Sequence, residues 1–311
     1  MVALTQLSAT DLAPLFEEEV GVWEREFSWD FRPSTDLLRR FLQIQSLTGY
    51  ALRAQSGITG YAYHVCEGRK GLIGDFFVRA SDTRSADEIL LLGAVVEELI
   101  RTPGIRRIES QLMILHAALP QQIPFSRYLT RYERQFMEIS REAIAAVPSK
   151  PVNFSARFAP WGERLQEDVV HVVAASYRGH IDSEINDQYR TIPGARQFLM
   201  NIIKFPGCGR FSADASMVAI DDRTGRLCAA CLASMVAPQS GHITQLCVLP
   251  AVRGARLGSQ LLRQTLLKLS ALGCTSVSLT VTSSNRDAIA LYESMGFRSR
   301  TTFPALVWEG F

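Results

Sequence analysis

Apolar residues recur along the chain at two spacings, one typical of strands and one typical of helices. In the second half, SMVAID and LCAACLASMVA predict strands joined by the turn 222–225, and GHITQLCVLP predicts another. Five leucines at helical spacing then predict a helix over about 256–272, which Gly273 closes. SVSLTVTS predicts a further strand, Asn285 a helix cap, and the last residues a strand pair that ends at Trp308.

The first half has the same order of elements. YALRAQS and ITGYAYHV predict paired strands, GLIGDFFVRA has the shape of GHITQLCVLP, and a helix is expected over about 85–101. Gly71 stands 170 positions before Gly241, and Gly104 stands 169 positions before Gly273. Two nearly equal offsets favour a duplicated α/β unit over two unrelated units that share a common order.

Each half also begins with helix-like segments, over 8–27 and 34–48 in the first half and over 162–177 and 192–204 in the second. A chain of 311 residues exceeds what one hydrophobic core usually holds. The segment Val147–Asn153 contains two prolines and is the expected linker. We therefore expect one domain over 1–148 and a second over 152–311.

Composition and charge narrow the class of protein. The chain is 47% hydrophobic and 21% charged, which is typical of a globular protein. Its net charge is +2, and it has no run of Lys and Arg, so neither nucleic acid nor an anionic membrane is expected as partner. No apolar run reaches the roughly 18 residues of a membrane helix. The first residues lack the pattern of a signal peptide, so a cytoplasmic protein is expected.

Cysteine and histidine are scattered, so no metal site is expected. Cys228 and Cys231 have the spacing of a zinc knuckle, but they lie in a predicted strand, where residues three apart face opposite sides. Reduced, buried thiols are the expected state of most of the six cysteines.

The segment LCVLPAVRGARLGSQLL carries the clearest chemistry. A strand ends, a tight loop follows, and a helix begins. The first N–H groups of a helix have no partner within the helix, and the helix dipole makes that end attractive to anions. Gly254 and Gly258 allow close approach to the backbone, and Arg253 and Arg256 add positive charge. This pattern predicts a phosphate-binding loop.

The same loop resembles motif A of the GNAT superfamily of N-acetyltransferases, which reads Arg/Gln, two residues, Gly, one residue, Gly/Ala. Arg253 and Gly258 match the ends of the motif, whereas Arg256 stands where its first glycine is expected. The stretch TVTSSNRDAIALYESMGF resembles the next block of the family, with Asn285 and Tyr292 at the matching positions. The resemblance covers about 167–308 and is specific over 243–297.

The resemblance implies an α/β (α+β) chain with two tandem GNAT-like domains, each a mixed, mostly antiparallel sheet flanked by helices. It also implies acetyl-CoA as cosubstrate and direct acetyl transfer to an amine, either of a small molecule or of a protein. Tyr292 is then the acid for the leaving thiolate, and the oxyanion contacts backbone N–H near Val248. The residues implied to bind the cofactor are Leu246, Cys247, Val248, Arg253, Gly254, Ala255, Arg256, Leu257, Gly258, Ser259 and Asn285.

The base that takes the amine's proton stays open. Some members carry a Glu on the strand before motif A, but this chain has Gln245 there, and His242 is expected on the opposite face. The segment SYRGHIDSEINDQY offers further candidates for the base, and a water chain is an equal alternative. These candidates are Tyr177, His180, Asp182, Glu184 and Tyr189. The residues of this segment expected to bind the acceptor are Tyr177, Asp182, Glu184 and Tyr189.

The first half lacks the residues that the resemblance assigns to the cofactor site. Its corresponding loop has no glycine, and Asp82, Asp87 and Glu88 are expected to repel a pyrophosphate. Pro120 is expected to cut short any helix after the next strand. The first half is therefore expected to be a degenerate domain without a CoA site. Two alternatives to an acetyltransferase stay open: a non-catalytic module that binds acyl-CoA, and an enzyme with a longer acyl donor.

Overall fold

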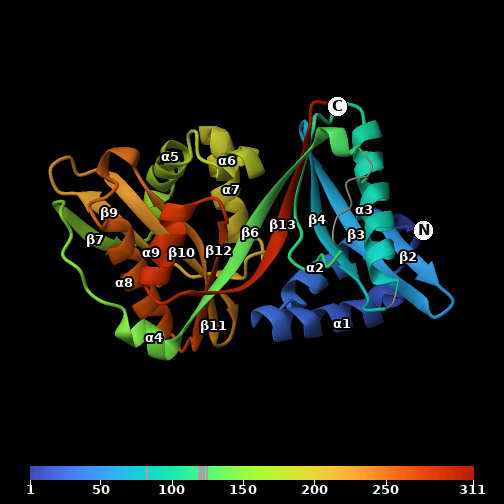
Figure 1. Cartoon of the computed structure of the whole chain (residues 1–311), viewed down its shortest axis with the longest axis horizontal. Helices are drawn as coiled ribbons and strands as arrows, with labels where there is room; N and C mark the ends of the chain where they lie inside the picture. Colours follow the sequence, from blue (N-terminus) through green and yellow to red (C-terminus); the bar gives the residue numbers. More distant parts are fainter. Residues whose placement is uncertain (82, 118–122, 124) are drawn as a thin grey trace. The chain divides into compact units, whose positions relative to one another are not determined.

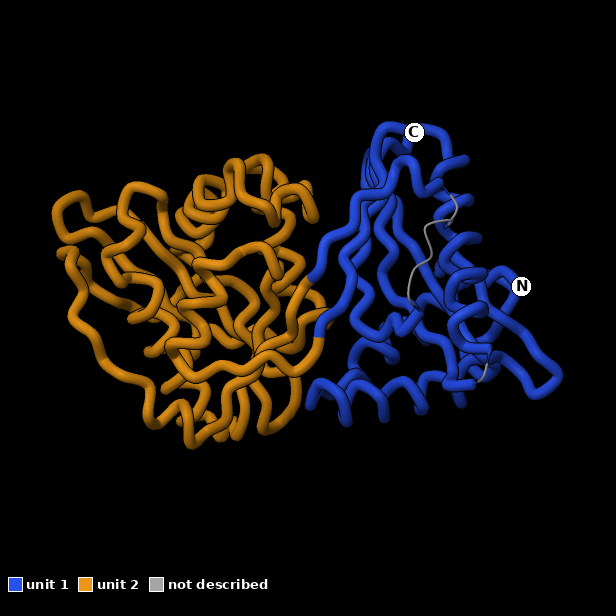
Figure 2. Tube along the Cα trace, viewed as in Figure 1, with its two compact units in different colours: residues 1–133, 302–311 blue, residues 134–301 orange. Residues whose placement is uncertain are grey.

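The structure is a computed structural model that describes residues 1–311 except 82, 118–122 and 124. The chain divides into two compact units (Figure 2). Unit 1 comprises Met1–Glu133 and Thr302–Phe311, and unit 2 comprises Arg134–Thr301. Helices flank mostly antiparallel strands in both, so the predicted fold class is confirmed (Figure 1).

Unit 1 has the strand order β1-β2-β3-β4-β5-β13, in which only β4 and β5 are parallel among the described pairs. Leucines and valines of α3 form its core with β3, β4 and β5. Its elements are β1 (Val2–Ala3), η1 (Leu4–Gln6), α1 (Ala9–Phe27), α2 (Arg32–Gln43), β2 (Thr48–Ala54), β3 (Gly57–Glu67), β4 (Lys70–Val78), α3 (Arg84–Arg101), β5 (Arg107–Gln111), η2 (Ser126–Tyr128) and the end of β13 (Arg298–Glu309).

Unit 2 has the order β6-β12-β11-β10-β9-β7, and β8 pairs with β10. One core lies under α8 and α9 and another under α5 and α7, so helices cover both faces of β10 and β11. Its elements are β6 (Leu129–Ser140), α4 (Arg141–Ala146), β7 (Ala156–Pro160), η3 (Glu163–Leu165), α5 (Gln166–Ser176), α6 (Asp182–Ile185), η4 (Asp187–Arg190), α7 (Ile192–Lys204), β8 (Arg210–Phe211), β9 (Met217–Asp221), β10 (Leu227–Ala237), β11 (Ser240–Val248), η5 (Pro250–Val252), α8 (Leu257–Ala271), β12 (Ser276–Thr282) and α9 (Arg286–Ser294).

Polar side chains fix where several helices begin. The Ser8 hydroxyl accepts the Asp11 backbone N–H at the start of α1, and the Thr191 hydroxyl accepts that of Gly194 at the start of α7. Asn285 caps α9 in the same way, as its sequence position predicts. Each cap satisfies a backbone donor that the helix itself leaves unpaired.

The two units repeat one pairing register. In unit 1 the parallel pairs of β4 and β5 run from Lys70–Arg107 to Ile73–Ser110. In unit 2 those of β11 and β12 run from Ser240–Ser276 to Ile243–Leu279. The two sets differ by 170 positions on the first strand and by 169 on the second, which are the offsets found between the glycines.

A glycine–leucine contact is repeated as well. A Cβ atom on Gly71 would lie 2.7 Å from a methyl carbon of Leu99, and one on Gly241 would lie 3.0 Å from a methyl carbon of Leu269. The helix therefore packs on the bare backbone of its strand in both units, at positions 170 apart. This shared contact supports the duplication favoured by the sequence.

The boundary between the units differs from the one expected. Val147–Asn153 lies within unit 2, where Arg263 and Arg256 bond the carbonyls of Val147 and Pro151. The reason is an exchange of strands, in which β6 follows the strands of unit 1 but pairs in unit 2, and the end of β13 follows unit 2 but pairs in unit 1. The chain leaves β5 and forms β6, whose last residues pair with β12, and the end of β13 pairs with β5. The expected final strand pair is therefore one long strand.

Three further findings concern membrane spans, metal sites and two of the cysteines. Among the described residues, no helix is long and apolar enough to cross a membrane. Within the same residues, no group of three or more His, Cys, Asp and Glu side chains is placed to hold a metal ion. Cys228 and Cys231 both join the core under α8, contrary to the expected opposite faces, because the pairing of β9 and β10 has an irregularity at Cys228.

Candidate active site

The conformation of the loop before α8 explains why motif A has a glycine at the position that Arg256 occupies in this chain. Arg256 has a positive φ of 66° and occupies the N-cap position of α8. Such a backbone costs a residue with a side chain roughly 1–2 kcal/mol, and glycine adopts it freely. The exposed Arg256 side chain donates to the Pro151 carbonyl at 3.4 Å. Arg256 thus adopts the backbone conformation that suits the motif glycine, at an energetic cost.

Arg253 acts in the structure as a clamp. Its guanidinium donates to the carbonyl of Ser176, the last residue of α5, at 2.6 Å, and to that of Val248 at 3.2 Å. A cation at these carbonyls also stabilises the C-terminal end of the α5 dipole. Arg253 therefore joins the end of β11 to the end of α5, and this use of its charge was not expected from the sequence.

Gly258 adds no side chain to the first turn of α8, although Val248 and Leu291 lie close to it. A Cβ atom there would meet only a Val248 methyl at 3.4 Å and a Leu291 methyl at 4.0 Å, which are ordinary contacts. Leu257 is buried in the core, and the Ser259 hydroxyl donates to the Arg256 carbonyl at 2.9 Å. Both residues lie in the first turn of α8, where backbone N–H groups have no partner within the helix.

Strands β11 and β12 pair for four residues and then part. Their pairs end at Ile243–Leu279 in the described residues, although β11 runs on to Val248 and β12 to Thr282. The register of β11 against β10 shifts at Thr244, which is a bulge. Leu249 N donates to β10, at the Cys228 carbonyl, so alternation along the strand turns the Val248 N–H away from β10.

Tyr292 lies on α9 with 9% of its surface exposed, and its ring centroid lies 5.9 Å from that of Phe297. Its hydroxyl has no hydrogen-bond partner within the part of the chain that the structure describes. Burial raises the pKa of Tyr292 well above its ordinary value. The phenol is therefore protonated at neutral pH, as an acid must be.

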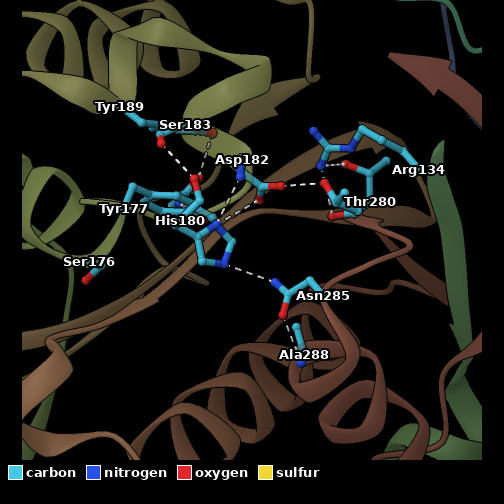
Figure 3. A network of polar contacts seen from close by, with 12 residues as sticks. Arg134, Ser176, Tyr177, His180, Asp182, Ser183, Tyr189, Thr280, Asn285 and Ala288 are labelled. Carbon is cyan, nitrogen blue, oxygen red and sulfur yellow. Dashed lines mark hydrogen bonds and ion pairs between the residues drawn. The ribbon is translucent and has the colours of Figure 1, made fainter. Parts of the chain in front are cut away.

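Asn285 connects this helix to the segment after α5 (Figure 3). Its side-chain oxygen accepts the Ala288 N–H at 3.3 Å, and its side-chain nitrogen lies 3.2 Å from Nε2 of His180. Nδ1 of His180 lies 3.1 Å from the Asp182 backbone nitrogen and 3.9 Å from its Oδ2. Burial lowers the pKa of His180, so the imidazole is neutral at pH 7. The Thr282 hydroxyl donates to Asp182 at 2.5 Å.

The two predicted tyrosines meet Gln245. Gln245 donates to the Tyr177 hydroxyl at 2.5 Å, and the Tyr189 hydroxyl donates to Gln245 at 3.4 Å. The two rings stack with centroids 4.2 Å apart. Burial raises the pKa of both tyrosines, so neither is a base at neutral pH. Glu184, in contrast, is exposed and pairs with Arg190.

Three polar side chains of β6, β11 and β12 received no functional role from the sequence. His242 is buried beside Ser278, 2.9 Å away, and burial lowers its pKa to about 3. Thr282 ends β12 directly before the Asn285 block, a position that could have signalled its role. Arg134, which donates to the Thr280 hydroxyl at 3.2 Å, was missed because the expected boundary placed it in the other domain.

The corresponding loop of unit 1 carries Asp87 and Glu88 as read from the sequence. Asp87 lies in the first turn of α3 and accepts the Thr83 hydroxyl at 2.9 Å, whereas Glu88 is fully buried. The expectations for Asp82 and Pro120 lie outside the described residues.

Known proteins resemble part of unit 2 in sequence and the whole chain in fold. Residues 183–297 match the model of the acetyltransferase (GNAT) family. No curated protein sequence matches the chain. The predicted resemblance to this family is confirmed.

Solved structures extend the likeness to both units. One is a tandem GNAT protein from the clavulanic acid biosynthesis pathway, with 16% identity, 99% of this chain and 97% of that chain covered, and a TM-score of 0.59. Another is a GCN5-related N-acetyltransferase from Sphaerobacter thermophilus, with 13% identity, 88% and 85% covered, and a TM-score of 0.59. A third is a GNAT-family acetyltransferase from Colwellia psychrerythraea, with 12% identity, 98% of each chain covered, and a TM-score of 0.53. Identities this low show the fold alone.

The strained loop generates a stability prediction. Arg256→Gly should raise the free energy of unfolding by about 1 kcal/mol, because glycine adopts a positive φ without steric cost. Chemical denaturation measures the change. Gln260→Gly, within α8, is the control and should lower stability by about 1 kcal/mol. A loss of stability in Arg256→Gly as large as that of the control would contradict the left-handed conformation.

Proposed function

We propose that this chain, whose residues 183–297 match the acetyltransferase (GNAT) family model, is an acyl-CoA-dependent N-acetyltransferase that transfers acetyl from acetyl-CoA to a primary amine. One observation carries the proposal: beside the open helix start at Gly258, β11 and β12 part after Ile243–Leu279. Parting leaves backbone groups of β11 that do not pair with β12, such as the Val248 N–H, for an amide-bearing ligand.

The residues present suit acetyl-CoA. The pyrophosphate would lie at the first N–H groups of α8, over 254–259, and the pantetheine arm would pair with the backbone of Leu246, Cys247 and Val248. Asn285 would contact the cofactor from the start of α9. The clamp formed by Arg253 holds this loop in place, and Arg256 is the exposed cation beside it.

The reaction needs one base and one acid. The ammonium group of the acceptor loses a proton to His180, whose neutral imidazole lies next to the carboxylate of Asp182. The amine nitrogen forms a bond to the thioester carbon, and the Val248 N–H stabilises the oxyanion. The C–S bond then breaks, and the thiolate takes the proton of Tyr292. The nitrogen gives up its second proton as the amide forms, and that proton restores the Tyr292 phenol.

The acceptor amine would lie between the parted strands and the segment after α5. Asp182 offers it a negative charge, and the stacked pair Tyr177 and Tyr189 offers aromatic surface. The amine of a small molecule and the amine of a protein are both compatible with this charge and this aromatic surface. We assign the cofactor site to unit 2 and none to unit 1, where acidic side chains stand in the corresponding turn.

Gly258→Glu tests the cofactor site. The variant places a carboxylate at the proposed phosphate position, and its Cβ has room, so the fold should persist while acetyl-CoA binding is lost. Calorimetric titration with acetyl-CoA measures the effect. Gln264→Glu, which adds the same charge farther along α8, should bind normally. Undiminished affinity in Gly258→Glu would remove the phosphate from this loop.

Tyr292→Phe tests the acid. It should lower kcat about 100-fold, the contribution typical of a positioned acid, and change the Kd of acetyl-CoA by less than about twofold. Steady-state turnover and calorimetry separate the two effects, with Tyr128→Phe in unit 1 as control. Unchanged turnover excludes Tyr292 as the acid. Acetyl-CoA binding without turnover on any amine would instead favour a non-catalytic binding module.

His180→Gln tests the base through pH. In the parent, kcat/KM should fall as pH drops through the His180 pKa, which lies below the ordinary 6.5, because the protonated imidazole accepts no proton. The variant should lose about 100-fold in rate and also lose this acidic limb. His171→Gln on α5 is the control. An acidic limb that persists in His180→Gln assigns the base to another group.

A further inference from the structure

Unit 1 contains a buried carboxylate at the position where unit 2 has the motif glycine. The matched registers and the Leu99–Gly71 and Leu269–Gly241 contacts align α3 with α8 at an offset of 170. Glu88 is therefore the counterpart of Gly258. Its side chain is fully buried, whereas the corresponding place in unit 2 holds no side chain.

The carboxylate of Glu88 is held by donors on two segments. Oε1 lies 3.0 Å from Nε of Arg84, one turn earlier on α3. Oε2 accepts the backbone N–H groups of His116 and Ala117 at 3.1 and 2.6 Å. Nδ1 of His116 lies 3.7 Å from Oε1. One guanidinium and two backbone amides are the groups that proteins use to bind carboxylates and phosphates.

The second segment also has a counterpart in the cofactor site. His116 follows β5 as Asn285 follows β12, at the offset of 169 that the strand registers define. In unit 1, Glu88 is itself the counterpart of Gly258, and its carboxylate contacts His116, the counterpart of Asn285. Burial acts to raise the pKa of Glu88, but the hydrogen bonds of His116 and Ala117 and the charge of Arg84 outweigh it, so the pKa lies below its ordinary value. Glu88 is an anion at neutral pH.

We propose that Glu88 is a built-in anion, which fills in unit 1 the place that the cofactor's phosphate takes in unit 2, and that removing it opens a binding site for a small oxyanion. The comparison with the phosphate rests on the function proposed above. The anion site itself rests only on the contacts of Arg84, His116 and Ala117 with Glu88.

Chemical rescue of Glu88→Ala in the full chain tests the proposal. Removing the carboxylate leaves Arg84 and two amides without their anion, so the thermal midpoint should fall by about 5–15 °C. Sodium acetate, added at constant ionic strength against sodium chloride, should raise the midpoint in a saturable way. The parent and Asp87→Ala, which removes the neighbouring carboxylate of the same turn, should gain nothing specific from acetate.

An acetate effect no larger than that of chloride, or equal in all three proteins, would overturn the site. If Glu88→Ala does not fold, Glu88→Gln keeps the volume and removes the charge. Its midpoint should fall clearly more than that of Glu97→Gln, whose carboxylate pairs with Arg101 on the surface. Equal falls would show that no anion is required. None of these measurements involves turnover, so they stand whether or not the chain proves to be an acetyltransferase.

Discussion

The short parallel pairing of β11 and β12 is the constraint on which the proposed site depends. Leu269 packs on the bare backbone of Gly241 and fixes α8 against the paired part of the strands. The bulge at Thr244 then redirects β11, so that the next residues pair with β10 alone while β12 continues beside β6. Backbone groups that a regular sheet would satisfy internally are thereby left for a ligand, at the level where α8 begins.

Unit 1 has the same constraint but different side chains around it. Strands β4 and β5 part at the equivalent pair, after a bulge at Gly74 that corresponds to Thr244. The counterpart of Gln245 is Asp75, which is half-buried and contacts the hydroxyl of Tyr61, as does the buried Glu19. Burial raises the pKa of both carboxyls, a state that favours a closed polar cluster shared by α1 and the sheet. The side chains placed on the shared backbone are therefore what distinguishes the unit proposed to hold the cofactor from the other.

Much of this could be predicted from local sequence. The helix α7 runs over the expected residues 192–204, Asn285 caps α9, and the loop before α8 lies where the glycines indicated, because these features depend on neighbours in the chain. The exchange of strands depends on pairing between distant segments, which local pattern does not encode. That exchange places Arg134 in unit 2 and makes Val147–Asn153 a segment bound to α8, so both were misjudged.

The loop conformation escaped prediction for a different reason. A sequence motif records which residue stands at Arg256 but not the positive φ that makes glycine usual there. Once that angle is known, Arg256 can be interpreted as a strained replacement for the motif glycine on the same loop path. The substitution adds strain and an exposed cation without redirecting the backbone, so the chain can lose the motif glycine and keep the path of the loop.

Two residues of the cofactor motifs also hold the segment proposed to receive the acceptor. Arg253 bonds the carbonyl of Ser176, where that segment begins, and Asn285 contacts His180 within it. Thr282, at the end of β12, holds Asp182. The proposed base is therefore positioned by the same loop, strand end and helix cap that would hold acetyl-CoA. A shift of any of these elements would change both halves of the proposed reaction, so the proposed cofactor and acceptor sites would form one structural unit even though their sequences lie far apart.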